Sequence, residues 1–169
     1  MLTELERAVY SFTALGCDPC DGRAYSLRYD MSALLALEKR GLSWRDVFAQ
    51  SITGEALCAF LTAGGTERSA AVQLLKADAR GAWAQCKRAM LLALPVRDPD
   101  VLEVQRPADG GPDMKRLRCL ICDVMRKPEE FFWSSTLREL IERWQAFAAV
   151  KGYAKEPERV VRFDTEGME

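Results

Sequence analysis

The sequence predicts a mainly α-helical protein, a compact bundle of short helices with a minor β-strand or hairpin element near the N-terminus. Apolar residues recur at helical spacing over most of the chain. Residues that cap helices, such as Ser, Thr and Asp, stand before these stretches, and Gly or Pro stands after them. The clearest alternation of apolar and polar residues that is typical of a strand is short and covers residues 23–29.

The first thirty residues are expected to form a helix, a loop and a strand. Thr3 and Glu6 have the spacing of a capping box, so a helix is predicted over residues 3–14. Residues 16–22 are rich in Gly, Asp and Pro, which predicts a loop. The short strand at 23–29 follows this loop.

Three short helices are expected next, with tight connections between them. Asp30 caps a helix over residues 31–40, and a second helix covers residues 43–50. Thr53 caps a third helix, which ends at Gly64. The apolar residues expected to face the core from this third helix are Leu57, Phe60 and Leu61.

A longer, alanine-rich helix is predicted over residues 66–94, weakened at Gly81 and stopped by Pro95. Residues 95–113 are rich in Pro, Asp and Gly, and only residues 101–104 have the composition of a strand. Such a stretch is typical of a linker or long loop, so it marks the expected domain boundary.

The C-terminal part is predicted to be a helical hairpin. Asp113 caps a helix whose apolar stripe continues to Met125, and Pro128 breaks it. Thr136 with Glu139 forms a capping box that begins a strongly amphipathic second helix. The expected division is an N-terminal helical domain at 1–94, a linker at 95–113, the hairpin at 114–153 and a charged tail at 154–169.

Composition and charge favour a soluble protein of the cytoplasm. The 24 Lys and Arg residues balance 25 Asp and Glu residues, so no long-range field favours nucleic acid or an anionic membrane. The N-terminus lacks the apolar stretch of a signal peptide, and no apolar run approaches the roughly 20 residues that span a bilayer. In the cytoplasm the six cysteines are expected to stay reduced.

The chain contains no histidine. Histidine is the usual general base near neutral pH and the commonest metal ligand. Its absence excludes Ser-His and Cys-His nucleophile pairs and His-containing zinc sites. We therefore expect a protein that is not an enzyme and needs no cofactor.

Two Cys-x-x-Cys pairs, Cys17 with Cys20 and Cys119 with Cys122, are candidate metal ligands. Four thiolates at these spacings can hold a structural zinc ion, which gives the alternative of a zinc-stabilised regulatory or nucleic-acid-binding protein. However, the pairs are far apart in the sequence, and the second lies in a predicted helix. The favoured interpretation is free, reduced cysteine.

Phe131, Phe132 and Trp133 are the candidate partner-binding residues. They form an aromatic cluster between two acids and the capping box at Thr136. One interpretation is that at least two of them are buried beneath the following helix. The functional interpretation is that part of the cluster is exposed and docks an apolar segment of a partner protein.

Two segments resemble the tail assembly chaperones of long-tailed bacteriophages and related tail-like particles. Residues 27–41 read LRYDMSALLALEKRG, and residues 52–57 and 60–64 read ITGEAL and FLTAG. This is similar to the short strand, helix and "Ala-Gly" turn with which that family opens. Residues 128–140, PEEFFWSSTLREL, are similar to its "Pro-x-x-Phe-Trp-x-x-Thr-x-x-Glu-Leu" element, with an additional Phe before the Trp.

The resemblance implies a non-catalytic helical protein of the host cytoplasm. Such a chaperone binds the tape-measure protein and helps to recruit tail-tube subunits around it. The physical mode would be capture of amphipathic helices in an apolar groove. A homo-oligomer is compatible with this role, and the Cys-x-x-Cys pairs are not part of the family pattern.

Overall fold

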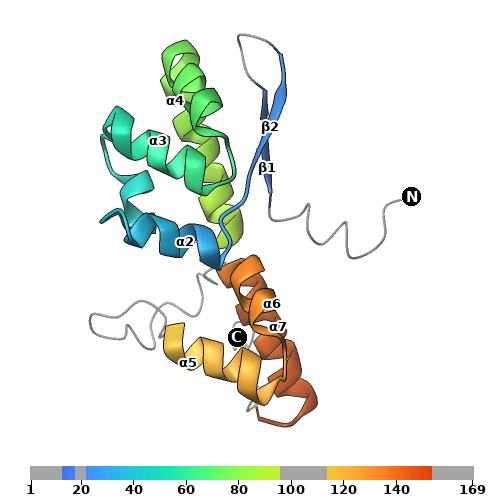
Figure 1. The fold of residues 1–169 in the computed structure, drawn as a ribbon. Coiled ribbons are helices and arrows are strands. Elements are labelled where there is room, and N and C mark those ends of the chain that lie inside the picture. Colours follow the sequence, from blue (N-terminus) through green and yellow to red (C-terminus); the bar gives the residue numbers. More distant parts are fainter. Residues whose placement is uncertain (1–12, 18–21, 96–113, 154–169) are drawn as a thin grey trace, which may run out of the picture.

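The computed structural model describes residues 13–17, 22–95 and 114–153, and these residues are mainly helical, as the sequence predicts. A two-stranded antiparallel sheet lies near the N-terminal end (Figure 1). The elements are β1 (Ala14–Cys17), β2 (Ala24–Leu27), α2 (Met31–Glu38), a 3₁₀ helix (Trp44–Phe48), α3 (Gly54–Ala63), α4 (Arg68–Ala93), α5 (Met114–Cys119), a π-helical turn (Leu120–Val124), α6 (Glu129–Ser134) and α7 (Leu137–Val150).

The hairpin corrects two expectations at the N-terminal end. Ala14, the predicted last residue of the first helix, begins β1 and pairs with Leu27. Gly16, placed in the predicted loop, pairs with Tyr25, whose ring lies where a Cβ atom on residue 16 would be. Glycine therefore allows an aromatic ring to cover the strand here. The remainder of the predicted helix, with Thr3 and Glu6, lies outside the described residues.

Two predicted helix starts, after Asp30 and after Thr53, are confirmed by capping hydrogen bonds. Asp30 Oδ1 accepts from the Ala33 amide at 2.8 Å, and Thr53 Oγ1 accepts from the Ala56 amide at 3.2 Å. Ser43 forms a capping box, but the helix that it begins is a short 3₁₀ helix. The cap at Asp113 and the strand at 101–104 lie outside the described residues.

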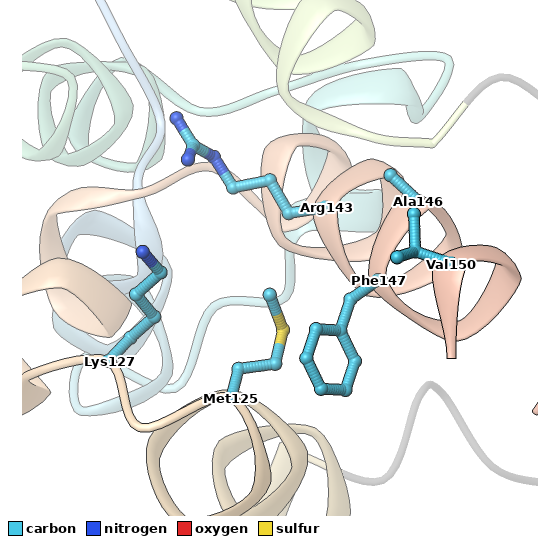
Figure 2. A pocket seen from close by; sticks show the side chains of 6 residues that line it. All are labelled: Met125, Lys127, Arg143, Ala146, Phe147 and Val150. Atoms are coloured by element: carbon cyan, nitrogen blue, oxygen red, sulfur yellow. The ribbon is translucent and has the colours of Figure 1, made fainter.

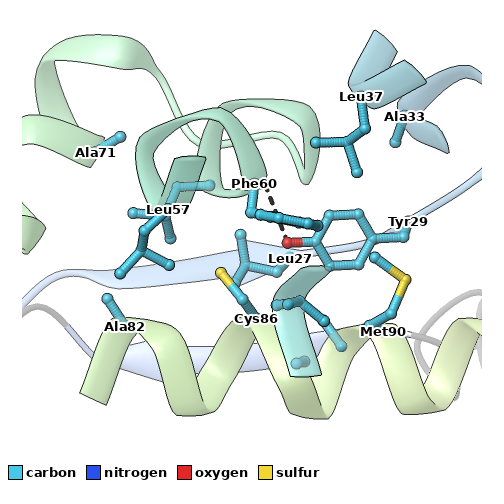
Figure 3. Packing of buried hydrophobic residues seen from close by; sticks show 14 of the residues in the cluster. Leu27, Tyr29, Ala33, Leu37, Leu57, Phe60, Ala71, Ala82, Cys86 and Met90 are labelled. Atoms are coloured by element: carbon cyan, nitrogen blue, oxygen red, sulfur yellow. Dashed lines mark hydrogen bonds between the residues drawn. The ribbon is translucent and has the colours of Figure 1, made fainter. Parts of the chain in front are cut away.

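The first hydrophobic core is enclosed by the hairpin, α2, α3 and α4 (Figure 3). Tyr29 and Phe60 are fully buried at its centre, with their rings edge to face and 6.3 Å apart. The Tyr29 hydroxyl donates a hydrogen bond of 3.0 Å to the Phe60 carbonyl, so the one polar atom of this ring is satisfied. Leu27 and Cys86 pack beside the pair.

Helix α4 is interrupted at Asp78, three residues before the predicted weak point at Gly81. The φ and ψ angles of Asp78 are −153° and 81°, which are not helical. Its carboxylate accepts a hydrogen bond of 2.9 Å from the Gly81 amide. Asp78 thus caps the second half of α4, and a Cβ atom on residue 81 would collide with this carboxylate.

The second hydrophobic cluster is formed by the C-terminal helices and by one buried residue of α2. The π-helical turn rotates the end of the predicted stripe, so Val124 is 43% exposed. Arg126 then adopts a left-handed conformation, with φ of 53°. The buried members of the cluster are Met31, Leu117, Ile121, Phe132, Leu137 and Leu140.

Hydrogen bonds join the start of α2 to the start of α7. Asp30 and Thr136 form an antiparallel bridge, and the Met31 amide donates to the Ser135 carbonyl at 3.0 Å. Arg28 Nη2 lies 3.1 Å from Glu139 Oε2, and both side chains are largely buried. The predicted linker at 95–113 and tail at 154–169 fall almost wholly outside the described residues, so the proposed division into domains stays a prediction.

Over the part of the chain that the structure describes, no helix is both long enough and apolar enough to cross a bilayer.

Candidate functional site

An apolar groove of about 640 Å³ lies between α2 on one side and α5 and α6 on the other. Its volume falls in the range of roughly 300–1,000 Å³ that is typical of ligand-binding clefts. Most of its lining is aliphatic or aromatic. The lining residues are Met31, Leu34, Leu35, Glu38, Trp44, Met114, Lys115, Arg118, Glu129, Phe132, Trp133 and Leu137.

Local structure fixes both walls of this groove. The Asp30 cap and the bridge to Thr136 hold the first turn of α2 against the start of α7. On the other wall, Trp133 donates from its indole nitrogen to Glu129 Oε1 at 3.2 Å. The Trp133 ring also packs edge to face against buried Phe132, with centroids 5.2 Å apart. The aromatic wall is therefore preorganised rather than free to collapse.

Charged side chains border the apolar lining. Arg118 and Glu129 form an ion pair of 2.8 Å, but both side chains are about half exposed, so the pair contributes little to stability. Glu38 lies at the α2 side of the groove and is exposed. An apolar interior with a charged border is suited to holding the apolar face of a helix while its polar flanks stay in water.

The three predicted partner-binding residues separate onto different surfaces. Phe132 is buried but lines the groove together with half-buried Trp133. Phe131 lies beneath two cations instead, with Lys127 Nζ at 5.9 Å and the Arg143 guanidinium carbon at 4.9 Å from its ring centroid. Of the three, therefore, Phe132 is fully buried and the other two are partly accessible.

Sequence reasoning missed the α2 wall of the groove. Leu34 and Leu35 were placed in a helix, but nothing assigned them to a partner surface. A signal is available in the two adjacent leucines. Neighbouring residues of a helix point in different directions, so both leucines cannot face the hydrophobic core. Within the described chain, half-buried Leu35 packs against neither hydrophobic cluster.

A second, open hollow of about 430 Å³ lies between the end of the π-helical turn and the C-terminal half of α7. In Figure 2 the Met125 and Phe147 side chains approach each other across it, and the Lys127 and Arg143 side chains extend beside them. Ala146 and Val150 complete the lining. The surface is thus apolar at its floor and basic at its border.

The cysteine pairs are placed far apart. Cys17 ends β1 opposite Ala24, at the end of the hairpin away from α2, whereas Cys119 ends α5 and Cys122 lies in the π-helical turn that follows. Cys20 lies outside the described residues. The described segments contain no group of three or more His, Cys, Asp or Glu side chains that could hold a metal ion. Zinc binding through all four cysteines stays the alternative interpretation of the sequence, beside the favoured one of free, reduced cysteine.

The thiols of the second pair are held in their protonated form. A hydrogen bond with Asp123 is the main cause that raises the pKa of Cys119, which is exposed. Burial is the main cause that raises the pKa of Cys122. Because the thiolate is the nucleophile and the metal ligand, both shifts oppose reactivity and metal binding near neutral pH.

The largest pKa shifts belong to the first core, not to the groove. Burial raises the pKa of Tyr29 well above its ordinary value, and burial also raises the pKa of Cys86 to about 11. These two groups are enclosed among apolar side chains, where they cannot reach a substrate. Their shifts therefore reflect packing rather than a catalytic function.

Comparison with known proteins gave no match, whether with protein-family models, with curated protein sequences or with solved structures. The function of this protein is therefore inferred from the groove and from the resemblance of the sequence motifs.

Proposed function

We propose that this protein is a non-catalytic tail assembly chaperone that binds amphipathic helices of a tape-measure protein and helps to recruit tail-tube subunits. It would act in the cytoplasm of the host cell. The observation that carries the proposal is the apolar groove between α2 and α5–α6. The motif at residues 128–140, which resembles the family, supplies two of its aromatic residues, Phe132 and Trp133.

The energetics of the groove support a helical protein client. An α-helix presents apolar residues at positions i, i+3, i+4 and i+7, so several side chains enter one groove together. Fully burying one large apolar side chain contributes about 1.5–3 kcal/mol, so a few such residues suffice for stable binding. Leu34, Leu35, Trp44 and Trp133 are half-buried in the free protein and offer this apolar area.

Co-expression of the full chain with the products of its neighbouring genes tests the proposal. Native mass spectrometry is expected to show a complex with a long helical protein. Leu35→Glu introduces a charge into the groove without removing a side chain from either core, so it is expected to abolish that complex.

The matched control is Leu91→Glu, because Leu91 is 61% exposed on α4 and lines neither the groove nor the hollow. This control is expected to leave the complex intact. If the wild-type chain remains free when it is expressed with a tape-measure protein, the chaperone proposal is wrong. If both variants bind as well as wild type, the groove is not the client site.

A further inference from the structure

The hollow beside α7 has a chemistry different from that of the groove. Its floor is formed by Met125, Phe147 and Val150, and Lys127 and Arg143 border it (Figure 2). Val150 is 85% exposed although it is aliphatic, and nothing in the described chain covers it. An apolar floor this exposed is typical of an interaction surface.

The hollow also carries positive charge that is not fully neutralised. Among the described residues, Lys127 forms no ion pair, and its contact is with the Phe131 ring. Arg143 lies 3.7 Å from Glu139 Oε1, which is a long ion pair, whereas the other oxygen of Glu139 holds Arg28 at 3.1 Å. Because one carboxylate serves two arginines, the hollow retains a net positive character.

The hollow and the groove lie on different sides of α6. Consecutive helical residues are separated by about 100°, so Phe131 and Trp133 point about 200° apart. Trp133 lines the groove, whereas the Phe131 ring contacts the two cations that border the hollow. A ligand in one site therefore does not occupy the other.

We propose that this hollow is a second docking surface, which binds an acidic segment of a partner protein that carries an apolar side chain between its carboxylates. The apolar side chain covers Phe147 and Val150, and the carboxylates pair with Lys127 and Arg143. The inference extends the proposed function, because a chaperone with two separate surfaces can hold a client helix and a second protein together.

Charge complementarity selects this partner over a nucleic acid. A phosphate backbone would satisfy the two cations but would leave the apolar floor in contact with water. A segment with both carboxylates and an apolar side chain satisfies both parts of the surface. The balance of the whole chain, with a net charge of −1, also gives no general attraction for polyanions.

Fluorescence anisotropy with the full-length protein tests this inference and does not require a client helix. The probe is a labelled peptide, Gly-Asp-Glu-Phe-Val-Asp-Glu-Gly, which is expected to bind with a Kd below about 1 mM. Two comparison peptides replace the acids by Lys, or Phe and Val by Ser. Both are expected to bind at least about tenfold more weakly, because each lacks one half of the complementarity.

Charge variants locate the binding site. Lys127→Glu with Arg143→Glu is expected to weaken binding of the acidic peptide by about tenfold or more. The matched control is Lys76→Glu with Arg80→Glu, an exposed Lys and Arg on α4 that lie outside the hollow. Should the double variant fold poorly, two single variants at exposed residues replace it. Lys127→Glu tests the basic border of the hollow, and Val150→Ser tests its apolar floor.

The inference is overturned if the acidic peptide does not bind, if the Lys peptide binds equally well, or if the α4 control weakens binding as much as the hollow variant. It is also overturned if a single-stranded oligonucleotide displaces the acidic peptide at similar concentrations. None of these outcomes bears on the groove, so the chaperone proposal is tested separately by the Leu35→Glu complex.

Discussion

The two hydrophobic clusters of this protein differ in how completely they are enclosed. The first is covered by the hairpin and by helices that include α4, which is 26 residues long. The second takes its buried residues from α5 and α6, of six residues each, from the π-helical turn and α7, and from Met31 of α2. Such short helices have too few side chains to close their own apolar faces, and the groove lies beside them, whereas the hollow lies between the end of the π-helical turn and α7. Stability is therefore expected to reside in the first cluster and binding in the second.

The largest expected effect follows from removing the centre of the first cluster. Phe60→Ala leaves a cavity beneath Tyr29 and is expected to lower the free energy of unfolding by about 3–5 kcal/mol. Urea denaturation followed by circular dichroism measures this loss. A loss below about 1 kcal/mol would contradict the view that the first cluster holds the fold together.

Alkaline pH is expected to lower the free energy of unfolding by a somewhat smaller amount, through the first cluster. The pKa of Cys86 is about 11 in the folded protein against a reference value of 9.0, because its burial favours the neutral thiol. A raised folded pKa means that its stability is fully present below pH 9 and is lost as pH rises toward 11. The shift corresponds to about 2–3 kcal/mol.

Urea denaturation at a series of pH values between 8 and 11 measures this loss. Cys86→Ala serves as the comparison, because it removes the thiol and is expected to reduce the slope. The raised pKa of Tyr29, which has burial as its main cause, leaves a remaining loss of the same sign. An unchanged slope in Cys86→Ala would show that the thiol is not buried as described.

Weakening the contact between the two clusters is expected to lower the free energy of unfolding by an intermediate amount. Glu139→Gln weakens the ion pair with Arg28 and the capping box with Thr136, and should cost about 1–2 kcal/mol. Hydrogen exchange should show that the loss is confined to α7 and the first turn of α2. The comparison variant is Glu142→Gln, which weakens a partly exposed i,i+4 pair with Arg138 on the same helix. Equal losses of unfolding free energy in the two variants would show that the contact between α2 and α7 stabilises the protein no more than a pair within one helix does.

The smallest expected effect is a stabilisation. Arg126 has a φ of 53°, a left-handed conformation that glycine adopts without strain. Arg126→Gly is therefore expected to raise the free energy of unfolding by about 0.5–1 kcal/mol. Gly152→Arg makes the reverse change at the end of α7, where φ is 69°, and should destabilise. A destabilised Arg126→Gly protein would indicate that the arginine side chain contributes more than its backbone costs.

Local features of the sequence predicted most of the fold correctly. The starts of α2, α3 and α7 depend on hydrogen bonds between residues three positions apart, so Asp30, Thr53 and Thr136 could be identified as caps directly. Strand β1 was missed because Gly16 indicates a loop by itself. Its strand conformation depends on pairing with Tyr25 across the hairpin.

The candidate site could be predicted only in part, because its walls come from distant segments. Trp133 was identified from its aromatic cluster, and the structure places it in the groove. The adjacent leucines indicate only that one of them points away from the core. That Leu35 lines the groove depends on how α2 docks against α6 and α7 through Asp30 and Thr136. The hollow at Lys127 and Arg143 depends in turn on the π-helical turn and on the left-handed residue that follows it.

Hydrogen exchange on the complex with the co-expressed client tests the central claim most directly. The account predicts that client binding protects the backbone amides of α2, α5 and α6, which form the two walls of the groove. The amides of α3 and the first half of α4 should remain unchanged. Protection confined to α3 and α4, with none in α2 and α6, would contradict the claim that the groove binds the client.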